Sequence, residues 1–239
     1  MIKLDSRLKA IIDNVSDNAY VADVGCDHGK VIVELLLSKK AYKGIAIDKS
    51  IDSLEKTKTL AQLNNVEDKI KCFCSDGLLD ITSDVDTIII AGMGAFEIIN
   101  IISKRRLNAK YILTPHQDTP KLRQYLLENG YSIDKDYIVK SNGKLYTIIV
   151  AKSGVNIYNR RWIYLGANVP RSNHFQEYLQ KRSEFINKIC VNTKKLSNDL
   201  AKELEEIKLM QEVKVKDIIK VIETFAPLSL QGDFDNSGF

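Results

Sequence analysis

Apolar and polar positions along the first 151 residues predict a chain that switches repeatedly between strand and helix. Short apolar runs typical of buried strands are found at 20–24, 44–48, 70–74, 84–91 and 111–114. Capping residues and a helical spacing of apolar positions predict helices at 4–13, 31–38, 50–64, from 96 onwards, and at 122–128. Two last strands, 137–139 and 146–151, are joined through Ser141-Asn-Gly-Lys, which is a strong β-hairpin signal.

This order of elements predicts an α/β fold with a Rossmann-like sheet of about seven strands. Five strands alternate with helices, and an antiparallel pair then closes the sheet. A class I methyltransferase has this order, whereas a nicotinamide-dependent dehydrogenase has an all-parallel sheet. We therefore expect residues 1–154 to form one cofactor-binding domain.

The pattern changes after residue 154. Apolar positions between 175 and 207 follow heptad spacing, interrupted by Arg182, Thr193 and Glu203. This predicts a helical hairpin or coiled-coil appendage over 155–209, with a break near 191–193. Residues 210–239 form a separate tail, with a helix expected at 215–224. After this helix, the Ala226-Pro break and Asp235-Asn-Ser-Gly238 resemble the start of the YqfO-like dinuclear-metal family. The tail is therefore either a fragment of a fused neighbour or a native C-terminal helix.

Composition narrows the class of protein. The chain has 239 residues, of which 44% are hydrophobic and 28% charged, as in ordinary globular proteins. No run approaches the roughly 20 apolar residues of a membrane helix, and the first residues have no signal-peptide layout. We therefore expect a cytoplasmic protein without a membrane partner, monomeric by default. The four cysteines form no Cys-x-x-Cys pair, so neither a metal site nor a disulfide is predicted.

Positive charge is concentrated in the predicted appendage. The chain has a net charge of +4, and residues 155–209 carry 10 basic against 6 acidic side chains. This excess fits a phosphate-bearing partner such as RNA, although a solvated helix has the same composition. Asn159-Arg-Arg-Trp-Ile-Tyr164 offers guanidinium and aromatic planes for RNA; alternatively, Trp162 anchors the appendage on the sheet domain.

Val21-Ala-Asp-Val-Gly-Cys-Asp-His-Gly-Lys30 contains the main candidate ligand-binding loop. Packing alone does not explain a buried strand that ends in Asp23 and Gly25 and continues into Asp27 and His28 before a helix. Asp48 ends the second strand 23 residues after Gly25, where doubly wound folds place the carboxylate that binds ribose. No Gly-x-Gly-x-x-Gly is present, which argues against a dinucleotide.

S-adenosylmethionine is the cofactor whose groups this set of residues matches. We expect the first turn to hold its amino acid end, Asp48 its ribose and the Asp76-Gly77 turn its adenine. The predicted cofactor-binding residues, all at the carboxyl edge of the sheet, are Asp23, Gly25, Cys26, Asp48, Lys49, Asp76, Gly77, Ala91, Gly92 and Met93.

Several of these motifs together resemble the bacterial TrmK family. They are Leu4-Asp-Ser-Arg-Leu8, Ala22-Asp-Val-Gly-Cys-Asp-His-Gly29, Asp76-Gly-Leu78, Ala91-Gly-Met-Gly94, Leu122-Arg123 and Tyr146. The resemblance covers about residues 1 to 209 and implies S-adenosylmethionine-dependent methylation of N1 of adenine 22 in the tRNA D-loop. It also implies that the appendage grips tRNA. The chain departs from the family pattern at Cys26, Ala95 and Thr114-Pro115-His116, and the last departure bears on nucleotide specificity.

Methylation of N1 requires an unpaired adenine, because N1 lies on the Watson–Crick edge. Asp27 and His28 are candidates to accept a hydrogen bond from the exocyclic amine, and Arg7 to hold a phosphate or the flipped nucleotide. Structural interpretations remain beside these: Asp27 and His28 cap and orient the loop, Asp23 braces it, and His116 is a surface or packing residue. Two other functions also stay open, a methyltransferase of small molecules or proteins and a non-catalytic, cofactor-sensing RNA-binding protein.

Overall fold

The structure is a computed structural model that describes residues 2–167, 172–193 and 196–210. The chain forms two compact units, Met1–Tyr178 and Leu179–Phe239, which are considered separately. The predicted helix at 215–224 lies outside the described residues. In the ranges that the structure describes, no helix is long and apolar enough to span a membrane.

The first unit contains a seven-stranded sheet, whose strands are β1 (Ala19–Val24), β2 (Ala41–Asp48), β3 (Ile70–Cys74), β4 (Thr87–Met93), β5 (Lys110–Pro115), β6 (Tyr131–Ser141) and β7 (Lys144–Ser153). The helices of this part of the chain are α1 (Ser6–Asp13), α2 (Lys30–Leu37), α3 (Ile51–Leu63), η1 (Glu67–Lys69), α4 (Ala95–Lys104), α5 (Thr119–Glu128) and α6 (Arg160–Leu165). The last of the labelled helices, α7 (Asn173–Thr193), continues into the second unit.

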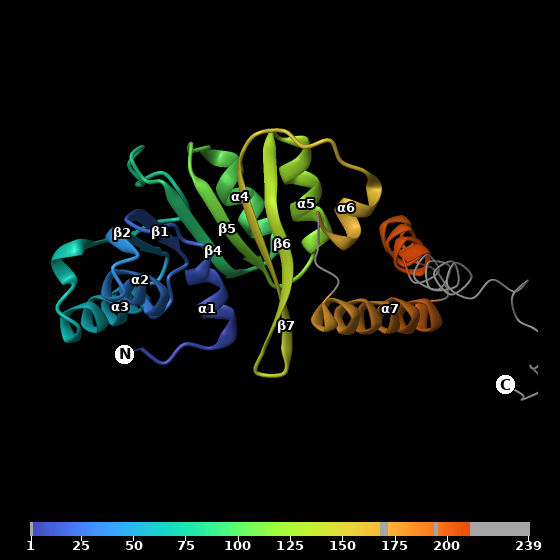
Figure 1. Cartoon of the computed structure of the whole chain (residues 1–239), viewed down its shortest axis with the longest axis horizontal. Coiled ribbons are helices and arrows are strands. Elements are labelled where there is room, and N and C mark those ends of the chain that lie inside the picture. Colours follow the sequence, from blue (N-terminus) through green and yellow to red (C-terminus); the bar gives the residue numbers. More distant parts are fainter. Residues whose placement is uncertain (1, 168–171, 194–195, 211–239) are drawn as a thin grey trace, which may run out of the picture. The chain divides into compact units, whose positions relative to one another are not determined.

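The strand order is β3-β2-β1-β4-β5-β7-β6, and the predicted fold is confirmed (Figure 1). β1 to β5 pair in parallel, whereas β7 is antiparallel to both of its neighbours. Strand order reverses at β1, which lies between β2 and β4. In open α/β sheets, ligands bind outside the carboxyl ends of the strands at such a point.

Side chains of the sheet alternate between two buried clusters. Ala22 and Ile90 pack with α4 and α5 on one face, whereas Val21 and Ile89 pack with α1, α2 and α3 on the other. Burial on both faces explains why β1 and β4 read as continuous apolar runs rather than as alternating ones. The two layers of helices leave the carboxyl edge of the sheet to be covered by loops.

Local signals place the helix starts close to the predicted positions. Asp5 caps α1 by accepting a hydrogen bond from the backbone N–H of Leu8, and Ser50 caps α3 in the same way through Ser53. The hairpin strands are longer than predicted, 11 residues for β6 and 10 for β7. The apolar pattern missed their extensions because β6, at the edge of the sheet, alternates buried and exposed positions.

A buried ion pair connects α5 and β6 with α6 and the residues directly after it. The guanidinium of Arg123 donates to both carboxylate oxygens of Asp136, from Nε at 2.8 Å and from Nη2 at 3.0 Å. It also donates to the carbonyl of Tyr164, and the N–H of Ala167 donates to Asp136. Both charged side chains are fully buried, so every polar contact they need comes from the protein.

The second unit, considered by itself, contains the end of α7 and a further helix at 198–210. The helical hairpin predicted from the heptad pattern is present, and α7 ends at Thr193, as the predicted break required. Arg182 and Glu203, which interrupt the heptads, form a bidentate ion pair at 2.7 and 2.8 Å. The two charged residues that interrupt the apolar pattern thus form an ion pair with each other.

Candidate active site

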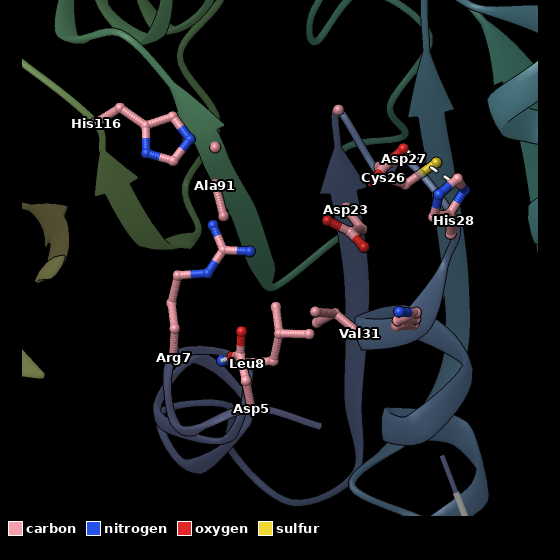
Figure 2. Close-up of a pocket in the computed structure, with 13 residues that line it drawn as sticks. Asp5, Arg7, Leu8, Asp23, Cys26, Asp27, His28, Val31, Ala91 and His116 are labelled. Atoms are coloured by element: carbon pink, nitrogen blue, oxygen red, sulfur yellow. Dashed lines mark hydrogen bonds and ion pairs between the residues drawn. The ribbon is translucent and has the colours of Figure 1, made fainter. Parts of the chain in front are cut away.

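Two adjacent cavities open at the carboxyl edge of the sheet and share Gly25, Ala91 and Gly92. The first, here called the loop cavity, has a volume of about 400 Å³ and the second, the ribose cavity, about 290 Å³. Residues that line the loop cavity include Asp5, Arg7, Leu8, Asp23, Cys26, Asp27, His28, Lys30, Val31 and His116 (Figure 2). Those that line the ribose cavity include Asp48, Lys49, Ser75, Asp76, Gly77, Met93 and Glu97.

All thirteen residues proposed from the sequence as catalytic or cofactor-binding line one of these two cavities. The structure therefore brings together residues from α1, the β1–α2 loop, and the ends of β2, β3 and β4. Their individual roles stay predictions, because position in a cavity does not by itself assign a ligand.

The first turn of the loop requires glycine at position 25. Gly25 has φ +73°, and a Cβ atom built there would lie 2.3 Å from Cε of Met93. The backbone of Gly25 is thus in van der Waals contact with a side chain of the ribose cavity, and the two cavities meet at this contact. Any larger residue would force the flexible end of the Met93 side chain, which lines the ribose cavity, to move.

Backbone N–H groups of the loop are already bonded within the protein. Those of Gly25 and Cys26 donate to the carbonyl of Ile47, and that of Asp27 donates to Oδ2 of Asp48 at 3.1 Å. A phosphate-binding loop instead presents free N–H donors to the anion. This loop presents carboxylates to the cavity, so it is suited to a cationic ligand rather than to a pyrophosphate.

Asp23 is the electrostatic centre of the loop cavity. Its side chain is buried, and burial together with the neighbouring carboxylates of Asp48 and Asp27 raises its pKa to about 7. Desolvation is the largest cause of this shift, and the negative charges of Asp48 and Asp27 add to it. A positively charged ligand would lower the pKa of Asp23 again and would gain affinity from its negative charge.

In the ribose cavity, Asp48 ends β2 and accepts two backbone N–H groups, those of Asp27 and Ser50. These bonds fix the orientation of the carboxylate and leave lone pairs for hydroxyl donors. Asp76 lies 3.1 Å from Nζ of Lys49, and this exposed pair contributes little to stability. An amine of a ligand can therefore replace the Lys49 contact at small cost.

At the mouth of the loop cavity, Asp27 has φ +52° and a mostly exposed side chain. Nδ1 of His28 lies 3.6 Å from Oδ1 of Asp27, too far for a hydrogen bond, and has no other hydrogen-bond partner. Nε of Arg7 is likewise buried without a hydrogen-bond partner among the residues that the structure describes. The side chains of Arg7 and His28 thus line the loop cavity with hydrogen-bonding capacity that contacts within the protein do not use up.

Cys26 is buried and its Sγ lies 3.6 Å from the hydroxyl of Thr57. Burial and the charge of Asp23 raise the pKa of the Cys26 thiol, so this residue packs the loop rather than acting as a nucleophile. Within the described part of the chain, no group of three or more metal-ligating side chains is close enough to hold a metal ion.

The sequence predicted His116 to be a surface or packing residue and did not include it among the site residues, and the structure places it in the lining of the loop cavity. Its position directly after β5, at the carboxyl edge, was the signal that identified the other strand-end residues. Burial and the nearby cations Arg7 and Lys144 lower the pKa of His116. Its imidazole is therefore neutral at physiological pH.

Comparison with known proteins agrees with this geometry. A family model described as a methyltransferase domain matches residues 4–149. The chain is 29% identical to the tRNA (adenine(22)-N(1))-methyltransferase of Bacillus subtilis over 158 residues, which are 64% of this chain and 66% of that enzyme. The matched part spans just under two thirds of the length of the curated relatives.

Two solved structures share the fold. TrmK of M. capricolum in complex with S-adenosyl-homocysteine has a TM-score of 0.78 at 18% identity, covering 88% of this chain and 98% of that chain. Sp1610 of Streptococcus pneumoniae in complex with S-adenosyl-L-methionine has a TM-score of 0.76 at 24% identity, covering 87% and 98%. The resemblance to TrmK proteins that the motifs indicated is confirmed. Because the family model covers more than half of the residues, this chain belongs to the methyltransferase domain family.

Proposed function

We propose that this protein uses S-adenosylmethionine to methylate N1 of adenine 22 in tRNA. The observation that carries the proposal is the meeting of two cavities at Gly25, Ala91 and Gly92. One cavity has the acceptors that a nucleoside needs, and the other has carboxylates and unpaired nitrogens. The activity of the B. subtilis relative and the complexes of the two solved structures support the choice of reaction and cofactor.

The residues of the site fit this cofactor. S-adenosylmethionine supplies, when bound, an electrophilic methyl group on a positively charged sulfur, together with an ammonium group. Asp23 and Asp27 provide negative charge for these cations in the loop cavity, and their neighbour Asp48 accepts from ribose hydroxyls in the ribose cavity. Asp76 accepts from the exocyclic amine of the cofactor's adenine. The close contact of Gly25 with Met93 keeps side chains out of the junction.

The residues of the loop cavity serve the target base. Methyl transfer would form the N1–CH3 bond as the S–CH3 bond breaks and leaves a neutral thioether, so positive charge would pass from sulfur to the base. The enzyme's main contribution is to align the two reactants. Asp27, whose side chain is mostly exposed, accepts from the exocyclic amine and stabilises this charge, with His28 beside it. Arg7, whose side chain lines the loop cavity, donates to the flipped nucleotide.

We assign a separate role to each of the three segments predicted from the sequence. Residues 1–154 bind the cofactor, the appendage of 155–209 contributes positive charge for tRNA, and 210–239 form a tail without activity of its own. The excess of basic residues in 155–209 supports the tRNA contact. We place the reaction in the cytosol and the acting form as a monomer.

One experiment tests this function directly. An unmodified tRNA transcript with adenine at position 22 is incubated with the protein and labelled S-adenosylmethionine, and methylated nucleosides are mapped by digestion. We expect N1-methyladenosine at position 22, and none in a matched transcript with guanine at that position. Label in a metabolite pool or in protein, with none in tRNA, would contradict the proposal; binding of both ligands without turnover would indicate a sensor.

A further inference from the structure

Three side chains from distant parts of the sequence meet beside the loop cavity. The guanidinium carbon of Arg7, on α1, lies 5.2 Å from the ring centroid of Tyr146, on β7. The imidazole of His116, which follows β5, has its ring centroid 6.3 Å from that of Tyr146. Tyr146 therefore contacts both residues, although it does not itself line the cavity.

Arg7 has an unsatisfied donor in this cavity. Figure 2 shows its guanidinium extending toward Ala91, with His116 on one side and Asp23 on the other. Its Nε is buried without a hydrogen-bond partner. An unpaired buried nitrogen shows that the contacts of this guanidinium within the protein are incomplete, while the side chain as a whole lines the loop cavity.

His116 lies next to the junction of the two cavities. A Cβ atom built on Gly92 would lie 3.7 Å from Nε2 of the imidazole, so the ring packs over the backbone of Gly92. Gly92 lines both cavities. The ring is thus close to where the two ligands meet, on the side of the cavity away from Asp27 and His28 (Figure 2).

We propose that Arg7 and His116 form the wall that contacts the target purine, and that Tyr146 is a positioning residue that holds both. Guanidinium and imidazole are planar groups that stack on bases, and Arg7 also donates to the ring-nitrogen acceptors of a purine. A neutral imidazole beside the base does not repel the positive charge that develops on methylation. This inference rests on the proposed function and extends it from the cofactor edge to the base site.

The test compares variants of the full chain by steady-state kinetics with tRNA and by equilibrium binding of S-adenosylmethionine. For Arg7→Met we expect kcat/KM for tRNA to fall at least about tenfold, with an unchanged Kd for the cofactor. His116→Ala should give a loss in the same direction. Tyr146→Leu should also lower kcat/KM for tRNA. Tyr146→Phe, which keeps the ring, should retain most of the kcat/KM of the unmodified protein.

Arg106→Met is the matched control, because Arg106 lies 4.4 Å over the ring of Tyr131 in a similar pair that lines neither cavity. Thermal melts of all variants separate loss of folding from loss of the base site. If Arg7→Met and Tyr146→Leu both methylate tRNA with the kcat/KM of the unmodified protein, this inference is overturned and the proposed function stays intact. Absence of tRNA methylation by the unmodified protein would overturn the proposed function, and this inference with it.

Discussion

Buried charged groups occur in two regions of the first unit, and the two regions differ in whether these groups have partners of opposite charge. Arg123 and Asp136 are fully buried, paired through two hydrogen bonds and further bonded to backbone groups of Tyr164 and Ala167. At the carboxyl edge, Nε of Arg7 is buried with no partner, and Asp23 is surrounded by further carboxylates.

The difference separates structural from functional charge. A buried ion pair whose hydrogen bonds are all made inside the protein needs nothing else and connects elements of the fold. A buried donor without an acceptor, or a carboxylate without a cation, is costly unless a ligand completes it. Unsatisfied charge, rather than burial of charge as such, therefore marks the site of this methyltransferase. Four experiments test this distinction.

The largest effect is expected at the structural pair. Asp136→Ala leaves the guanidinium of Arg123 buried without its partner, which costs about 3–5 kcal/mol of unfolding free energy. Urea denaturation measures the loss. Asp134→Ala, on the same strand but in an exposed pair with Lys152, should cost less than about 1 kcal/mol. Equal losses in the two variants would mean that the buried pair is not what stabilises this region.

At Asp27, the carboxylate proposed to contact the target base, we expect the reverse: a loss of activity without a loss of stability. Asp27→Asn removes the charge and keeps a residue that tolerates φ +52°. At saturating cofactor and tRNA, we expect kcat to fall about 100-fold or more, with little change in melting temperature. Alanine at the same position should also abolish turnover, beyond any loss of cofactor affinity. Turnover that survives in both variants at saturating cofactor would rule out the role of Asp27.

Two glycines with nearly equal φ angles allow the effect of backbone strain to be measured separately from the effect of a side-chain clash. Gly25 has φ +73° and Gly143 has φ +75°, so alanine at either position costs about 1–2 kcal/mol of backbone strain. Of the two, only Gly25→Ala also forces Met93 in the wall of the ribose cavity to move, because no described residue lies within 4 Å of a Cβ at Gly143. Calorimetry should show a more than tenfold weaker Kd for S-adenosylmethionine in Gly25→Ala. The same Kd in both variants would contradict the proposed junction.

The smallest effect is a pH dependence. The pKa of Asp23 is about 7, so its carboxylate is negative above pH 7 and becomes protonated below it. Affinity for a cationic cofactor should therefore be highest at pH 8 and fall about tenfold by pH 6. The Asp23→Asn variant should bind more weakly at pH 8 and lose this dependence. A wild-type affinity that stays flat from pH 6 to 8 would show that Asp23 does not interact with the cofactor's charge.

Much of the fold was predictable because its signals are local. Apolar runs and caps identified β1 to β5 and the helices between them, since strand and helix periodicity is a property of neighbouring residues. The hairpin lengths were wrong because the extensions of β6 and β7 lack a continuous apolar run. In the second unit, heptad spacing predicted the hairpin, but not that the interrupting Arg182 and Glu203 bond to each other.

The sequence by itself determined which residues gather at the carboxyl edge of the sheet. The strand end, its glycine turn and the acidic residue at the end of the next strand all belong to one βαβ unit, so their spacing along the chain predicts their neighbourhood in space. Only the tertiary structure decided how this edge becomes two cavities. The contact of Arg7 with Tyr146, the place of His116 beside Gly92, and the Arg123–Asp136 pair depend on strand order and register. Arg7 and Tyr146 lie far apart in sequence, and no local pattern encodes a contact that forms only when β7 inserts between β5 and β6.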